Sequence, residues 1–303
     1  MKYLFSLFFF FAFVFCYAQQ SKFDNNASFK PFDYNAENLD TSQQNIYYQL
    51  SFVNNPEKLN SKLQIVCILE LGKMKTKFLD FNRIKSDSLV KKFSFEKEIS
   101  GKEMNNLLAY HSKWRNVLIK DNKTKSIIFQ DHAAKTFQYE EILPELKWNL
   151  EKENKTILGY ACNKATTEYR GRKYIAWYTT DTISISSGPY VFEGLPGLIL
   201  EISDTKDHFN FTAIAMDKIP REIYLNNEKH ILKVTREQFR KVQKNYHNNP
   251  GFFLNGGAYN PDGTEIKTDP KYSKPYNPIE LEYLNAYELS CCKHLKPMDN
   301  TIG

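Results

Sequence analysis

The feature of this sequence that most restricts its fold is a succession of short segments with the residue pattern of β-strands. Some alternate apolar and polar residues, as strands with one buried face do, and others are short apolar runs that fit strands buried on both faces. Polar turns separate them. We predict strands at residues 46–53, 63–71, 77–83, 115–121, 126–131, 135–140, 147–152, 155–170, 173–179, 198–204 and 208–216. The predicted fold class is mainly β with a few helices (β-rich α+β), built on a curved antiparallel sheet or half-barrel.

Two segments begin with the spacing of a capping box, in which a Ser or Thr and a Glu or Gln three residues later bond to each other's backbone. They are Ser100 with Glu103 and Thr235 with Gln238. We therefore predict two helices. The predicted buried face of the second consists of Phe239, Val242 and Tyr246. Its charged residues are assigned to solvent or to partners, as is usual for an exposed helix face; they are Arg236, Arg240, Lys241 and Lys244.

The amino terminus has the pattern of a secretory signal peptide, because Lys2 precedes an apolar run at residues 4–15 and small residues near Ala18. The run is well below the roughly 20 residues of a membrane-spanning helix. We predict a signal peptide at residues 1–18, a single β-rich domain at residues 19–303, and no transmembrane segment after cleavage. Lipid attachment at Cys16 is the alternative, which the bulky residues before it disfavour. The predicted location is the periplasm or cell envelope.

Composition is that of an ordered globular protein, with 42% hydrophobic, 15% aromatic and 25% charged residues. Loss of Lys2 with the signal peptide lowers the formal net charge from +6 to +5. Because the basic residues are scattered along the chain, we do not predict nucleic-acid binding.

Four cysteines remain after the predicted cleavage, and disulfides persist in an oxidising compartment. A ring between adjacent cysteines is strained, so a bridge from Cys67 or Cys162 to Cys291 or Cys292, or between Cys67 and Cys162, is more plausible. The alternative, a metal site at Cys291, Cys292 and His294, matches no familiar zinc spacing. We therefore predict no metal.

No familiar catalytic pattern is present: the sequence lacks G-x-S-x-G, H-E-x-x-H, the P-loop and a G-x-G-x-x-G that opens a helix. A calcium loop near Asp262 fails because Ala258 stands at the first ligand position, and Asp262 and Gly263 fit a hairpin turn. We predict no catalytic residues and no cofactor. A hydrolase whose site assembles only in three dimensions stays an alternative.

The segment "GPYVFEGLPGLI" (residues 188–199) contains closely spaced turn residues. Pro196 and Gly197 fit a type II turn, with a positive φ at the glycine. Two interpretations remain open: a corner packed in the core, or the mouth of a pocket that presents groups to a ligand. The predicted structural turn residues are Gly188, Pro189, Gly194, Pro196 and Gly197.

"GLPGLI" at residues 194–199 resembles the name-giving motif of the GLPGLI family of exported Bacteroidetes proteins, and residues 157–179, 187–202 and 276–282 extend the resemblance. The family has no established activity, so the resemblance implies export but no catalytic residues. By looser analogy the fold is similar to LolA-like half-barrels. The sequences "DSL" and "DTI" also resemble O-glycosylation acceptor motifs of such proteins, at Ser88 and Thr182.

Residues 245–263 combine asparagines with aromatic residues, which suits a recognition loop; the alternative is a loop whose aromatic side chains cover the sheet. We predict a non-catalytic envelope protein that binds or transports an apolar small molecule, a peptide or an envelope protein. A docking accessory to an outer-membrane receptor is a further alternative. The predicted contact residues are Trp177, Tyr178, Tyr190, Phe192, Phe252, Phe253 and Tyr259.

Overall fold

The computed structural model describes residues 22–181, 185–250 and 275–281. Within these ranges the protein is mainly β, with three helices beside one large sheet, which confirms the predicted fold class. The strands are β1 (Ser28–Phe29), β2 (Ala36–Val53), β3 (Lys62–Gly72), β4 (Lys75–Asp80), β5 (Ile99–Ser100), β6 (Val117–Asp121), β7 (Ser126–Ala133), β8 (Lys135–Ile142), β9 (Asn149–Ile157), β10 (Tyr160–Tyr169), β11 (Arg172–Thr179), β12 (Leu198–Asp204), β13 (Phe209–Asp217), β14 (Glu222–Asn226) and β15 (Leu232–Lys233). The helices are α1 (Phe81–Phe93), α2 (Gly101–Ala109) and α3 (Arg236–Asn248).

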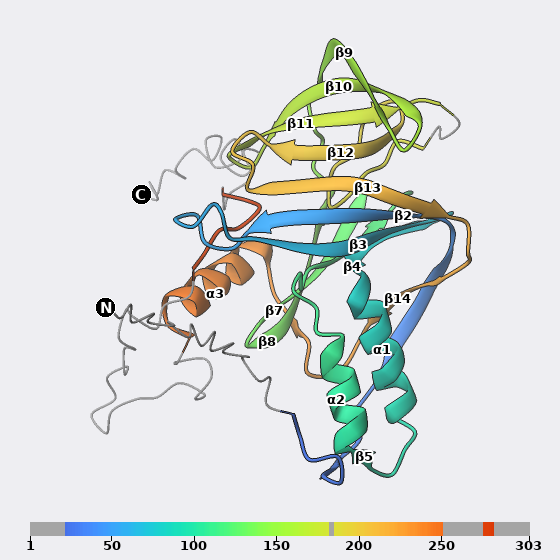
Figure 1. Ribbon diagram of the computed structural model, residues 1–303, viewed down its shortest axis with the longest axis vertical. Helices are drawn as coiled ribbons and strands as arrows, with labels where there is room; N and C mark the ends of the chain where they lie inside the picture. Colours follow the sequence, from blue (N-terminus) through green and yellow to red (C-terminus); the bar gives the residue numbers. More distant parts are fainter. Residues whose placement is uncertain (1–21, 182–184, 251–274, 282–303) are drawn as a thin grey trace, which may run out of the picture.

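The large sheet has the order β15-β8-β7-β6-β4-β3-β2-β13-β12-β11-β10-β9, and β14 pairs with the first part of β2. Its pairings are antiparallel except that β15 pairs parallel with β8. Figure 1 shows β2 and β13 running across the view while β7 and β8 run steeply past α3. The strand direction therefore changes strongly along the sheet, as accumulated twist requires, and the sheet is curved.

Two of the differences between the predicted strands and the structure have a clear local cause. The segment predicted as one strand at residues 155–170 is a hairpin, because Leu158 and Gly159 form a two-residue turn with φ of 51° and 83°. The strand predicted at residues 77–83 ends at Asp80, whose carboxylate accepts a hydrogen bond from Asn82 N at 2.9 Å and so begins α1. The sequence analysis missed this helix.

Both predicted capping boxes are present, at Ser100 before α2 and at Thr235 before α3. Helix α3 packs on the sheet through Phe239, whose ring lies 5.7 Å from that of Phe137 and 5.9 Å from that of Tyr139, centroid to centroid. The opposite face of the sheet holds a smaller core of Ile68, Leu79 and Val117, with Phe81 of α1 against it. The two faces of the sheet are thus covered separately.

The corner at residues 185–199 is built differently from the prediction. Gly197 does not have a positive φ, and its N–H bonds to Leu195 O at 2.8 Å around Pro196, so the type II turn is wrong. Glycine is needed here because a Cβ on Gly197 would lie 1.9 Å from Thr179 O. Gly188 is also closely packed, whereas Gly194 has a φ of +98°.

This corner fills the concave side of the sheet. The Phe192 ring lies 4.6 Å from that of Tyr174 on β11, whereas the Tyr190 ring lies 6.4 Å from that of Phe129 on β7. Strands β11 and β7 are far apart in the sheet order, so the corner joins its two halves. Of the two interpretations of the motif, the packed corner fits these contacts.

Cys67 and Cys162 are free, buried thiols, which contradicts the predicted disulfide between them; Cys291 and Cys292 lie outside the described residues. The sheet order gives the physical reason, since Cys67 is on β3 and Cys162 is on β10, five places apart. The predicted signal peptide also lies outside the described ranges. No helix within those ranges is both long and apolar enough to cross a membrane.

Candidate functional site

A cleft of about 440 Å³ lies beside α3, where the loop before β6 meets the end of β7. Its walls combine aromatic rings with charged and amide side chains. One side of the cleft is formed by residues 275–279. They belong to the segment 275–281, which we call the strap. The side chains that line the cleft include Lys113, Trp114, Arg115, Asn116, Asp131, His132, Arg240, Gln243, Tyr246, His247 and Tyr276.

The strap is held by side chains that recognise its backbone. Arg172 donates to Asn277 Oδ1 and to Pro278 O, both at 2.7 Å, and Tyr174 OH donates to the carbonyl oxygen of Ile279 at 3.1 Å. Arg172 is itself paired with buried Asp204 at 3.0 Å. The strap is therefore fixed against β11, and it places Tyr276 at the cleft.

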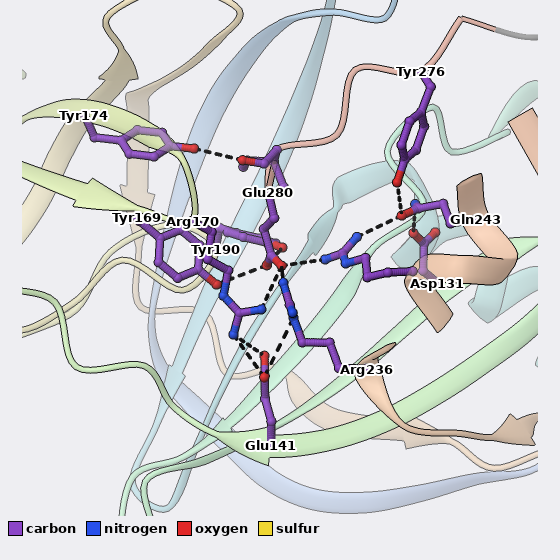
Figure 2. Close-up of polar contacts among 12 residues, drawn as sticks. Asp131, Glu141, Tyr169, Arg170, Tyr174, Tyr190, Arg236, Gln243, Tyr276 and Glu280 are labelled. Carbon is purple, nitrogen blue, oxygen red and sulfur yellow. Dashed lines mark hydrogen bonds and ion pairs between the residues drawn. The ribbon is translucent and has the colours of Figure 1, made fainter. Parts of the chain in front are cut away.

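Behind the cleft, Glu280 of the strap is buried, and Figure 2 shows tyrosine and arginine side chains that point toward its carboxylate. Its carboxylate lies 2.6 Å from Arg236 Nη2, 2.8 Å from Arg240 Nη2 and 3.1 Å from Arg170 Nη1. Two phenols donate to it as well, Tyr190 at 2.7 Å and Tyr169 at 3.1 Å. The carboxylate of Glu280 thus links the strap to α3, to β10 and to the corner.

Local backbone geometry explains how these donors converge. Arg170 and Gly171 form the two-residue turn between β10 and β11, with φ of 44° and 81°, which suits a twisted hairpin. Tyr190 also has a positive φ, 54°, which is rare for a bulky residue and is sustained only by surrounding contacts. On α3, Arg236 and Arg240 are four residues apart and so share one face.

The ionisation of this cluster follows from its donors. Burial raises the pKa of Glu280, but the nearby charges of Arg240 and Arg170 and the tyrosine hydrogen bonds outweigh burial and hold its pKa below 4.5. Glu141 pairs with Arg170 at 3.0 Å, and its pKa is raised, chiefly by burial. Glu280 is therefore the carboxylate that stays ionised.

Asp131 is the buried acid of the cleft itself. Its Oδ1 accepts from the backbone N–H of His132 at 2.6 Å and its Oδ2 from Gln243 Nε2 at 3.2 Å. Burial raises its pKa to about 6, against the lowering effect of the charges of Arg240 and Arg115. A carboxyl group that titrates near neutrality in a cleft is a typical functional group.

The residues predicted as contacts do not gather here. Tyr178, Tyr190 and Phe192 are buried in the core. They are not accessible to a ligand at the surface, which corrects their prediction as contact residues. Trp177 is half-buried, with Lys155 Nζ 4.5 Å from its ring centroid. The other predicted contact residues, Phe252, Phe253 and Tyr259, lie outside the described residues. Of the two predicted O-glycosylation sites, Thr182 also lies outside them, and Ser88 is exposed on α1.

The sequence analysis missed Asp131 and Glu280, and it placed Arg236 and Arg240 on an exposed helix face, for solvent or partners, which is wrong. Both arginines are buried. A positional signal was present, since Arg236, Arg240 and Gln243 follow the same helical period as Phe239. Among the described residues there is no group of three or more His, Cys, Asp or Glu placed to hold a metal ion.

Comparison with known protein families matches residues 94–240 to the family described as N-glycanase peptide, N-terminal domain. The match includes Trp114, Asp131 and Arg240 and ends before the strap. Comparison with curated proteins gives no match. Two solved structures of PNGF-II, in space groups P21 and C2, are similar with a TM-score of 0.47 each and 16% and 17% identity, over 69% of this chain. The chain spans about a third of their length, since 34% of each is covered.

Proposed function

We propose that the cleft beside α3 binds an oligosaccharide, free or attached to a peptide, and that the protein acts by binding. The observation behind the proposal is the composition of the cleft, in which the aromatic rings of Trp114, Tyr246 and Tyr276 stand among amide and charged side chains. Sugars present apolar C–H faces and many hydroxyl groups, so their sites need both rings and convergent hydrogen-bonding groups. This proposal replaces the apolar ligand expected from the sequence.

The family match supports the same ligand class. The matched family is described by the name of an N-glycanase, and the matched residues include Trp114, Asp131 and Arg240 of the cleft. We further propose, from the sequence motifs, that the chain is an exported GLPGLI-type protein. An exported protein would meet glycans and glycopeptides outside the cytoplasm.

A second candidate function, glycan hydrolysis, is favoured by Asp131. Its pKa of about 6 lets the carboxyl group give or take a proton near neutral pH, which general acid–base catalysis needs. Both of its oxygens already accept hydrogen bonds, however, and a hydrolase normally pairs such an acid with a second group that acts on the bond. Binding is therefore the primary proposal.

The test is isothermal titration calorimetry of the purified chain with a free N-glycan and with the same glycan on a peptide. We expect saturable binding that weakens about fivefold in Tyr276→Ala, because a ring contact contributes roughly 1 kcal/mol and a tenfold change requires about 1.4 kcal/mol. Tyr110→Ala, at the end of α2 and outside the cleft lining, is the matched control and should bind normally. Absence of binding at millimolar glycan would refute the proposal. Release of glycan by the wild type but not by Asp131→Asn would establish hydrolysis instead.

A further inference from the structure

We infer that the ligand of the cleft is acidic, specifically an oligosaccharide with a carboxylate group. This inference rests on the proposed function and specifies its substrate class. It starts from the charges on the cleft walls. Lys113, Arg115 and Arg240 bring positive charge to the lining, whereas Asp131 is the one acidic residue among the lining side chains that the structure describes.

The charges behind the walls do not offset this excess. Apart from Arg240, which is already counted in the lining, Arg170 and Arg236 balance the two carboxylates Glu280 and Glu141. Burial raises the pKa of Glu141, so this carboxylate contributes at most its one formal negative charge. The field at the cleft is therefore positive, and a positive cleft with low-dielectric walls concentrates anions.

Hydrogen-bonding capacity gives an independent argument. Trp114 and Arg240 both line the cleft and are 7% and 2% exposed, yet Trp114 Nε1 and Arg240 Nε have no acceptor within the described residues. Buried donors without acceptors are uncommon in folded proteins, and a binding site is one place where they occur. The acceptors of Asp131 are already used by His132 and Gln243.

Two further donors stand at the rim. Lys113 and Arg115 are exposed, and their side chains have no ion pair within the part of the chain that is described. Arg115 is the stronger candidate of the two, because a guanidinium group presents paired donors that match the two oxygens of a carboxylate. The cleft thus offers an excess of donors and of positive charge, which an acceptor-rich anionic sugar satisfies and a neutral sugar satisfies only in part.

The experiment compares a biantennary N-glycan ending in sialic acid with the same glycan after removal of its sialic acids. Dissociation constants are measured for the wild type, for Arg115→Ala, and for Lys173→Ala as an exposed basic control on β11. We expect the sialylated glycan to bind about two- to fivefold more tightly at 50 mM salt, as one ion pair with an exposed guanidinium group provides. Arg115→Ala should remove most of that preference without changing affinity for the neutral glycan, and Lys173→Ala should change neither.

The outcomes separate the two proposals. Equal affinity for both glycans would overturn the acidic ligand while leaving the oligosaccharide site intact. Loss of affinity for both glycans in Arg115→Ala would also overturn it, because the side chain would then serve the neutral part of the ligand. Binding of a glutamate-rich peptide as tightly as the sialylated glycan would show that charge alone is recognised. Absence of binding to either glycan would refute the proposed function itself.

Discussion

Glu280 and Glu70 are both buried glutamates, but they lie on opposite faces of the sheet and differ in protonation. Glu280 is surrounded by three arginines and two phenols, and its pKa is lowered. Glu70 on β3 lies opposite Lys77 on β4, its Oε2 has no hydrogen-bond partner among the described residues, and burial raises its pKa to about 7. Burial alone therefore does not decide the charge of an acid here; the number of donors does.

Lys77 shows how burial acts on a base. Burial lowers its pKa to about 8, with Glu70 opposing that shift, and its Nζ lies 3.3 Å from the ring centroid of Tyr224. Burial therefore moves the pKa of this acid and the pKa of this base toward neutrality. The Glu280 cluster holds the strap and the cleft wall, whereas Glu70 and Lys77 lie on the sheet face that carries the smaller core of Ile68 and Leu79.

The largest expected effect is from Glu280→Gln. Removing the charge leaves three buried arginines with Glu141 alone, and breaking a buried ion pair costs about 3–5 kcal/mol in the free energy of unfolding. Urea unfolding at pH 7 measures it. Because the folded pKa of Glu280 is below 4.5, its contribution is present above that pH and is lost as the pH falls through the folded pKa.

The control for Glu280→Gln is Glu168→Gln, an exposed change of the same chemistry on β10, which should alter stability by less than about 0.5 kcal/mol. A difference between wild type and Glu280→Gln that stays constant down to pH 2 would contradict the ionised state of Glu280. Similar small losses for both variants would show that the arginines find other partners.

An intermediate effect is expected from Tyr190→Phe, which removes one donor from the Glu280 carboxylate. A hydrogen bond to a charged group contributes roughly 1.5–3 kcal/mol, more than one to a neutral group. Tyr174→Phe is the matched control, because its OH donates to the neutral carbonyl of Ile279 and should cost about 1 kcal/mol. If Tyr174→Phe were the more destabilising of the two in urea unfolding, the charge of Glu280 would not be what Tyr190 stabilises.

Much of the sheet could be predicted from the sequence, and the site could not, for a physical reason. Strand alternation and capping boxes are local patterns, so residues 198–204 and the caps at Ser100 and Thr235 were correct. The partner of Arg240 is Glu280, forty residues away, and no local pattern indicates that pairing. Charged residues were therefore assigned to solvent by default, and aromatic residues of the corner were assigned to contacts when they are core.

The smallest effect at pH 5, and the sharpest test of the comparison, is from Glu70→Gln. The folded pKa of Glu70, about 7, is above its ordinary value of 4.5, so the folded state binds the proton more tightly than the unfolded state. Wild-type stability relative to the variant should therefore fall as the pH rises from 4.5 to 7. We expect Glu70→Gln to cost less than about 1 kcal/mol at pH 5 and to gain about 1–3 kcal/mol on the wild type by pH 8, at roughly 1.4 kcal/mol for each pKa unit. Urea unfolding across this range measures the slope. A slope of the opposite sign would mean that Lys77 keeps Glu70 ionised. A single partner would then be enough to hold a buried glutamate in its charged form, and the number of donors would not explain the difference from Glu280.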